Sequence, residues 1–213
     1  MNLFAKNILI RDMSSVLDFT KISSEFDKLE LVRNYGNSTS KTKLFFNDPL
    51  FKNERNILIS ECKTFLNTYF NMSGFYENLQ LTNSWTNITK PGEYHHEHKH
   101  PYSIVSGILY LDNNPSNLNL KMQEFKPEVP YFLYNTAHLF TLRELVSETV
   151  SEKENNLKHH LILFLANCAH SVDPVPVYCN PRRSVSFNTF WKGRVGIIDQ
   201  ELSSMNFDDI TNI

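Results

Sequence analysis

The stretch Glu93-Tyr94-His95-His96-Glu97-His98-Lys99-His100-Pro101 contains four of the eight histidines of the chain within six positions. It leads into residues 104–111, a short apolar run whose composition is typical of a strand. Alternate side chains of an extended segment project to the same side, so His96, His98 and His100 would share one face. Imidazoles held on one face of a rigid sheet suit a divalent metal ion.

A third ligand would have to come from a distant part of the chain. His170 is an isolated late histidine, and it follows the strand-like run at residues 161–166. We therefore predict a metal site formed by His98, His100 and His170.

Other histidines leave alternatives open. His96 shares the predicted face, so it could replace His98 or His100 as a ligand or lie just outside the ligand set. His95 and Glu97 are expected to point the other way, into solvent. A histidine-rich turn can also be a solvated surface without metal chemistry. Three further histidines are expected to be ordinary surface or core residues: His138, His159 and His160.

Composition limits the classes of protein to consider. The chain has 213 residues, of which 41% are hydrophobic and 21% charged, as in ordinary soluble globular proteins. A net charge of -2 provides no positive surface for nucleic acid or anionic lipid. No apolar run reaches the length of about eighteen residues that a membrane span needs. Three scattered cysteines are too few for a disulfide framework, so we expect a cytoplasmic protein.

The periodicity of apolar residues changes along the chain. Residues 13–32 and, more clearly, residues 56–70 show the three- and four-residue steps of amphipathic helices, the second of which would bury Cys62. A first strand is expected at residues 3–10, and residues 139–146 could be helix or strand. Short strand-like runs separated by turns dominate from about residue 79, at residues 79–89, 104–111, 118–122, 161–166 and 182–191.

This order predicts an α+β fold with a barrel-like antiparallel body. We expect residues 1–213 to form a single domain. Its helical N-terminal part would span about residues 1–75, and its β-rich core about residues 76–195.

Several stretches resemble a known family when their order and spacing are taken together. They are Trp85-Thr86-Asn87, the block from His98-Lys99-His100-Pro101 to Ser106-Gly107-Ile108-Leu109-Tyr110, the strand Leu161-Ile162-Leu163-Phe164 followed by His170-Ser171-Val172, and Arg182-Arg183-Ser184-Val185-Ser186-Phe187-Asn188. These stretches resemble the 2-oxoglutarate/Fe(II)-dependent oxygenases, in particular a family common in marine bacteria and their phages.

The resemblance implies a double-stranded β-helix, a cupin-like jelly roll, with the N-terminal helices packed on it. It also implies Fe(II) and, as co-substrate, 2-oxoglutarate, whose distal carboxylate would bind an arginine that offers a forked donor. On a strand, Arg182 and Ser184 share one face, so we assign Arg182 to the carboxylate with Ser184 in support, and we expect Arg183 to point outward.

The sequence departs from the superfamily pattern at two places. The second position of the metal motif is usually Asp or Glu, and here it is His100. The family's usual Phe-Pro-Ser-Trp before the late histidine is here Phe164-Leu165-Ala166-Asn167-Cys168-Ala169. The first departure concerns the geometry of the metal site, and the second leaves the wall of the pocket unassigned.

We therefore expect an Fe(II)- and 2-oxoglutarate-dependent dioxygenase that hydroxylates a small-molecule or peptide substrate with O2. One alternative is a non-catalytic β-barrel binding protein with a structural zinc, to which Cys168 could contribute a thiolate. Another is a three-histidine dioxygenase without 2-oxoglutarate, which would leave Arg182 without a role. The sequence selects neither the substrate nor the oligomeric state.

Overall fold

The computed structural model describes residues 8–70, 79–113, 116, 118–123, 137–141, 157–195 and 205–206. The helical elements are α1 (Phe19–Phe26), η2 (Phe45–Asn47), η3 (Pro49–Phe51) and α2 (Lys52–Phe70). The strands are β1 (Ile8–Asp12), β2 (Leu31–Arg33), β3 (Ser38–Ser40), β4 (Leu79–Thr89), β5 (His95–His98), β6 (Val105–Tyr110), β7 (Leu118–Gln123), β8 (Ala137–Thr141), β9 (His160–Leu165), β10 (Ala169–Val172), β11 (Arg182–Trp191), β12 (Arg194–Val195) and β13 (Met205–Asn206).

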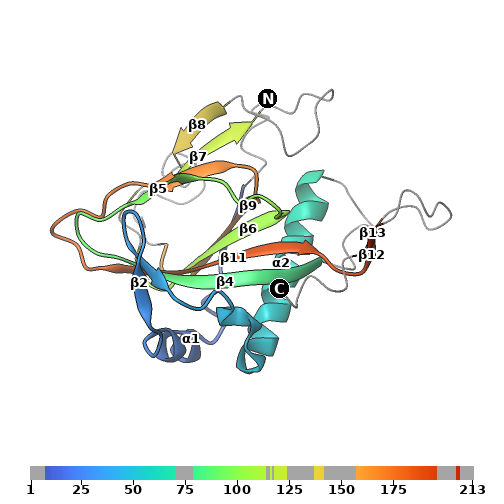
Figure 1. Cartoon of the computed structure of the whole chain (residues 1–213), viewed down its shortest axis with the longest axis horizontal. Coiled ribbons are helices and arrows are strands. Elements are labelled where there is room, and N and C mark those ends of the chain that lie inside the picture. The colour runs from blue at the N-terminus through green and yellow to red at the C-terminus, as the bar shows by residue number, and fades with distance from the viewer. Residues whose placement is uncertain are drawn as a thin grey trace.

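Two antiparallel sheets form the body of the molecule. The larger has seven strands in the order β1-β9-β6-β11-β4-β3-β2, and the smaller has four in the order β5-β10-β7-β8. Strands far apart in sequence pair directly, as β4 does with β11 and β5 with β10. Figure 1 shows the smaller sheet lying over the larger one, with the two helices on the opposite side of the larger sheet. The predicted α+β fold with a double-stranded β-helix core is confirmed.

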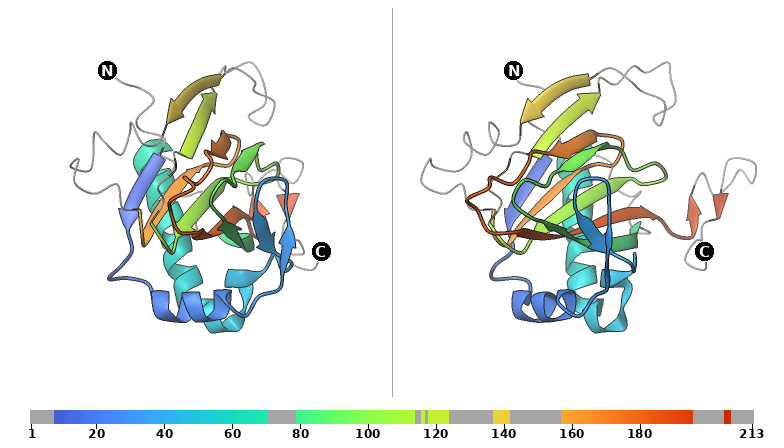
Figure 2. Two further views of the ribbon diagram at one scale, coloured as in Figure 1. Left: turned by 90° about the vertical axis from the view of Figure 1, so that its left-hand side faces the viewer. Right: turned by 60° about the vertical axis from the view of Figure 1, so that its left-hand side comes forward.

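The helices cover the outer face of the seven-stranded sheet (Figure 2). Helix α2 buries Leu58, Cys62, Phe65 and Leu66, which recur at the spacing of one helical face. These side chains belong to the same apolar core as Phe187 of β11. The predicted helix at residues 56–70 is therefore confirmed, although it begins at Lys52, and Cys62 is buried as predicted.

The first predicted helix is shorter than the apolar pattern suggested. Helix α1 begins after Asp18, whose carboxylate accepts a hydrogen bond from the amide of Lys21, and it ends at Phe26. Residues 31–33 form β2 instead, which pairs with β3 as a hairpin. The prediction of helix was therefore wrong at residues 31 and 32. The apolar residues in this segment fit the spacing of a helix only approximately, and pairing with β3 determines the structure instead.

The central strands of the larger sheet present two different faces. On β11, Val185 and Phe187 join the core under the helices, whereas Arg182 and Ser184 face the space between the two sheets. Phe187 lies directly opposite Gly107 of β6, where a Cβ atom would fall 2.2 Å from the Cζ of the ring. Glycine is required at this position because any side chain would occupy the space of the aromatic ring.

The interior of the jelly roll holds a second apolar cluster. It consists of Ile8, Ile108, Tyr110, Leu118, Leu157, Ile162, Phe164, Cys168 and Val172. These residues close one side of the space between the sheets and leave its remaining wall to polar side chains of β4, β5 and β11.

Two segments of the sequence prediction lie partly outside the described residues. The first predicted strand is found as β1, which begins at Ile8 and pairs with β9. The undecided segment at residues 139–146 begins within β8, and its part after Thr141 lies outside the described residues. Among the helices that the structure describes, none combines the length and the apolarity needed to cross a membrane.

Candidate metal centre

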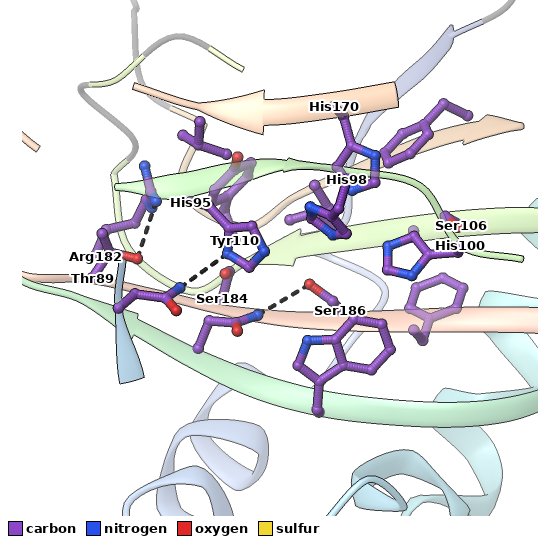
Figure 3. Close-up of a pocket in the computed structure, with 18 residues that line it drawn as sticks. Thr89, His95, His98, His100, Ser106, Tyr110, His170, Arg182, Ser184 and Ser186 are labelled. Atoms are coloured by element: carbon purple, nitrogen blue, oxygen red, sulfur yellow. Dashed lines mark hydrogen bonds between the residues drawn. The ribbon is translucent and has the colours of Figure 1, made fainter. Parts of the chain in front are cut away.

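Three of the predicted site histidines converge at one end of the cavity between the sheets (Figure 3). His98 of β5 and His170 of β10 are direct register partners, so their side chains share a face, and His100 follows two residues after His98. One nitrogen from each ring lies within 4.8 Å of the others. Within the described part of the chain, this is the group of side chains placed to hold a metal ion.

Backbone hydrogen bonds orient two of these rings. His98 Nδ1 lies 2.9 Å from the carbonyl oxygen of His96, and His170 Nδ1 lies 3.0 Å from that of Cys168. A carbonyl only accepts, so each Nδ1 carries the proton and donates it. Nε2 of each ring therefore keeps a free lone pair, which is the form that binds a metal ion.

Burial keeps these rings neutral. His170 is 4% exposed, and its removal from water holds the pKa of the ring well below its ordinary value. Burial, assisted by the nearby His98, lowers the pKa of His100 to about 3. Burial also lowers the pKa of His98. Neutral imidazoles are the ligand form, so a metal ion would not have to displace protons from this cluster at neutral pH.

His95 lies inside the cavity, contrary to the prediction that it is solvated. Val172 pairs with His95 and His170 pairs with His98, so two steps along β10 correspond to three along β5. This register shift turns His95 to the same face as His98, and their ring centroids are 4.6 Å apart. Burial, followed by the neighbouring His98, lowers the pKa of His95 to about 3.

His96 is not among the three histidines whose nitrogens converge, although its ring stacks on that of His95, with 5.3 Å between centroids, and lies 5.0 Å from that of His98. Its ring packs edge-on against the exposed ring of Tyr35, with 5.0 Å between centroids. The geometry thus brings His98 and His100, rather than His96, next to His170. His159, expected to be an ordinary surface or core residue, is partly buried and stacks on Phe19 at a centroid distance of 3.8 Å, while the side chain of His138 lies outside the described residues.

Cys168 contributes its backbone rather than its thiol. The side chain lies in the apolar cluster inside the jelly roll, and burial raises the pKa of the thiol to about 12. Such a thiol stays protonated at neutral pH. The group of ligand atoms that lie within 4.8 Å of one another accordingly contains the three histidines and not Cys168.

Arg182 lies at the other end of the same cavity. It is 3% exposed, and its Nη2 donates to Thr89 Oγ1 at 3.1 Å. Ser184 lies on the same face of β11 and pairs across the sheet with Tyr110 of β6. The Tyr110 hydroxyl is buried, and it has no hydrogen-bond partner among the residues that the structure describes. A ligand that reaches Arg182 would also meet this hydroxyl.

Arg183 lies on the opposite face, as the strand alternation predicts. Its Nε and Nη2 donate to the two carboxylate oxygens of Asp112, at 2.9 and 3.1 Å, and its Nη1 donates to Asp27. The hydrogen bond with Asp112 is the main reason why the pKa of Arg183 is raised. Arg183 therefore joins α1 to the sheet and does not enter the cavity.

Four cavity residues were assigned no role in the predicted site, although two of them, Trp85 and Asn87, belong to a stretch that carries the family resemblance. Thr89 is the cross-strand partner of Arg182, and Asn87 donates to Ser186 Oγ at 3.1 Å. Trp85 lies 5.4 Å from His100 between ring centroids. Asn37 comes from the polar segment at residues 34–43, which contains no motif. The alternation of β4 could have identified the first three, because Trp85, Asn87 and Thr89 share one face of that strand.

These features define a class of protein: a double-stranded β-helix with a histidine cluster and a buried arginine at opposite ends of one cavity. Residues 83–188, about half of the chain, match the family described as "Putative 2OG-Fe(II) oxygenase". The chain belongs to this family of 2-oxoglutarate/Fe(II)-dependent oxygenases, as its sequence motifs predict. No curated protein sequence matches it.

Solved structures share the fold at low sequence identity. An oxidoreductase of the 2OG-Fe(II) oxygenase family from Burkholderia pseudomallei is 10% identical, with a TM-score of 0.54 over 89% of this chain and 86% of that one. A prolyl-4-hydroxylase from Pseudomonas putida is 14% identical, with a TM-score of 0.52 over 90% and 96%. HygX from Streptomyces hygroscopicus, solved with nickel and 2-oxoglutarate bound, is 12% identical, with a TM-score of 0.54 over 88% and 84%.

Proposed function

We propose that this oxygenase binds Fe(II) through His98, His100 and His170 and binds the distal carboxylate of 2-oxoglutarate through Arg182, and that it hydroxylates a small-molecule or peptide substrate. The observation that carries the proposal is the placement of both groups in one cavity. A single co-substrate could then contact the metal ion through its keto acid end and the guanidinium through its distal end.

The histidine cluster fits Fe(II) by the chemistry of its donors. Three neutral imidazole nitrogens on one side of an ion leave its remaining positions open for a co-substrate and O2. The ligand set carries no charge because His100 stands where the superfamily usually has a carboxylate. The ion would therefore keep its full double charge, which favours a dianionic co-substrate.

The other end of the cavity fits a carboxylate. Arg182 supplies a forked cationic donor, and Thr89 fixes one of its nitrogens. Tyr110 offers a buried hydroxyl, and Ser184 a second one on the same face as the guanidinium. A carboxylate bound here would satisfy the Tyr110 hydroxyl, whose burial without a partner is otherwise unfavourable.

The remaining walls of the cavity control access and position. When bound, the metal ion and 2-oxoglutarate together supply the oxidative chemistry of the family. Phe164 packs against His170, with 4.7 Å between ring centroids, and Trp85 lies beside His100. These apolar surfaces keep water away from the ligand rings. The face beside Trp85 is the one we assign to the substrate.

Metal analysis combined with 2-oxoglutarate turnover tests this function. Protein purified without oxygen should bind about one Fe(II) per chain and should form succinate from 2-oxoglutarate when O2 is admitted. Iron binding without any binding or turnover of 2-oxoglutarate would instead favour the three-histidine dioxygenase, and stoichiometric zinc that resists exchange would favour the binding protein.

A further inference from the structure

The hairpin of β2 and β3 delivers one side chain into the cavity. Its tip is closed by a hydrogen bond from the amide of Asn34 to the carbonyl of Asn37, at 2.8 Å. The tip packs closely against Tyr94, the residue just before β5. A Cβ atom on Gly36 would lie only 2.5 Å from the carbonyl oxygen of Tyr94. The amide of Tyr94 donates to the carbonyl of Gly36 at 3.1 Å. The position of Asn37 is therefore fixed relative to His95, which follows Tyr94 and is the first residue of β5.

Asn37 determines which nitrogen of His95 carries the proton. Asn37 is 1% exposed and lines the cavity, and its Nδ2 lies 3.0 Å from His95 Nδ1. An amide nitrogen can only donate, so His95 Nδ1 accepts. The single proton of the ring is then on Nε2, which becomes a hydrogen-bond donor.

This proton separates His95 from the metal ligands. His98 and His170 give their Nδ1 protons to backbone carbonyls and keep Nε2 free, whereas His95 has the reverse arrangement. A nitrogen that carries a proton cannot bind a metal ion. A fourth imidazole so close to the cluster therefore needs another role.

The location of His95 suggests that role. Its ring lies beside His98, with 4.6 Å between centroids, and it lines the same cavity as Arg182 (Figure 3). His95 thus stands between the two groups assigned to the ends of 2-oxoglutarate. The co-substrate is a dianion at neutral pH, and each of its oxygen atoms accepts hydrogen bonds, so a donor at this point would match it.

We propose that His95, held by Asn37, donates a hydrogen bond from Nε2 to bound 2-oxoglutarate. His95 is then a co-substrate-binding residue, and Asn37 is a positioning residue that acts through it. This inference rests on the proposed function, because it takes the histidine cluster and Arg182 as the two ends of the binding site.

The test measures 2-oxoglutarate affinity separately from turnover. The Fe(II)-loaded chain is titrated anaerobically with 2-oxoglutarate, by calorimetry and by the visible absorption that chelation to the metal produces, and iron content is measured for every variant. His95→Ala should retain iron and bind 2-oxoglutarate at least about tenfold more weakly, because a hydrogen bond to a charged group is lost. His95→Gln, which retains an N–H donor, should recover part of the affinity.

A double-mutant cycle tests the part assigned to Asn37. Asn37→Ala should weaken binding about threefold to tenfold, since His95 remains but is no longer oriented. The double variant should bind no more weakly than His95→Ala alone, because Asn37 acts only through His95. His159→Ala is the control: it removes an imidazole that stacks on Phe19 and does not line the cavity, and it should bind like the wild type.

Each contrary result has a distinct meaning. Wild-type affinity in His95→Ala overturns the inference and leaves the proposed function standing. Loss of iron in His95→Ala makes His95 a metal ligand, which also overturns it. Additive effects in the double variant overturn the coupling through Asn37. If the iron-loaded wild type itself fails to bind 2-oxoglutarate, the proposed function fails.

Discussion

Replacing Arg182 with alanine should weaken 2-oxoglutarate binding and leave the metal site intact. The guanidinium is 3% exposed and lies in the same cavity as the histidine cluster, so a carboxylate bound to it would be shielded from water. A charge-assisted hydrogen bond contributes about 1.5–3 kcal/mol in such a setting. Since about 1.4 kcal/mol corresponds to a factor of ten, we expect a loss of about tenfold to a hundredfold in affinity.

Arg183 provides a matched control on the neighbouring residue. Arg183→Ala removes the paired hydrogen bonds to Asp112 and the bond to Asp27, all on the helix side of the sheet. These groups are partly exposed, so the loss should be about 1 kcal/mol, which corresponds to a decrease in Tm of about 2–4 °C for a chain of this size. Its affinity for 2-oxoglutarate should stay within about twofold of the wild type.

Calorimetric titration of 2-oxoglutarate into the iron- or manganese-loaded variants measures the first effect, and thermal unfolding measures the second. Arg182→Lys should recover only part of the affinity, since an ammonium group cannot make the forked contact. The assignment would be refuted if Arg183→Ala lost binding while Arg182→Ala retained it. Equal affinity in all three variants would mean that the carboxylate binds elsewhere.

Four further outcomes are expected. His170→Ala should abolish stoichiometric Fe(II) binding, and full iron occupancy measured by elemental analysis would contradict the ligand assignment. His100→Asp should retain iron, because it restores the carboxylate usual in the superfamily, and His100→Ala should lose it; full iron occupancy in His100→Ala would argue against His100 as a ligand. Gly107→Ala should destabilise the fold by about 1–3 kcal/mol in urea unfolding, as the new methyl group meets Phe187. The metal-free protein should lose stability on acidification from about pH 7 towards pH 4: the folded pKa of His100 is lowered to about 3, so the unfolded chain binds more protons in that window. A Tm that rises with acid would contradict this.

Regular strand alternation allowed part of the site to be predicted. Strand β11 pairs with β4 without interruption from Arg182 to Asn188, so every second residue does face the cavity. His98 and His170 came together for a related reason, because each lies on a strand and the two strands pair directly. Where pairing is regular, the sequence alone indicated which face each side chain takes.

The same rule failed where a strand is irregular. His95 was expected in solvent because alternation was assumed to continue unbroken from His96 to His100. The register shift between β5 and β10 adds one residue and reverses the direction of His95. No residue pattern within this stretch marks the shift. Asn37 could not be found either, because its role depends on a hairpin that reaches the cavity only in the folded chain.

The division near residue 75 into a helical part and a β core stays a prediction. Side-chain contacts join the two parts, so we expect them to stabilise each other. Phe187 of β11 packs on Phe46, with 6.5 Å between ring centroids, and Arg183 binds Asp27 at the end of α1. We propose that residues 1–213 unfold as one cooperative unit.

Function and stability are interleaved on β11 rather than assigned to different parts of the chain. Arg182 and Ser184 face the cavity, whereas Arg183 and Val185, one residue further along each time, bind or pack against the helical side. The backbone that fixes one set also fixes the other, because a strand that shifted by one residue would exchange the two faces. The helices therefore contribute to the site without touching it: the core formed with Val185 and Phe187 of β11 fixes which face of the strand Arg182 takes. Substitutions at cavity-facing positions should thus change ligand affinity, and those at the alternate positions should change the free energy of unfolding.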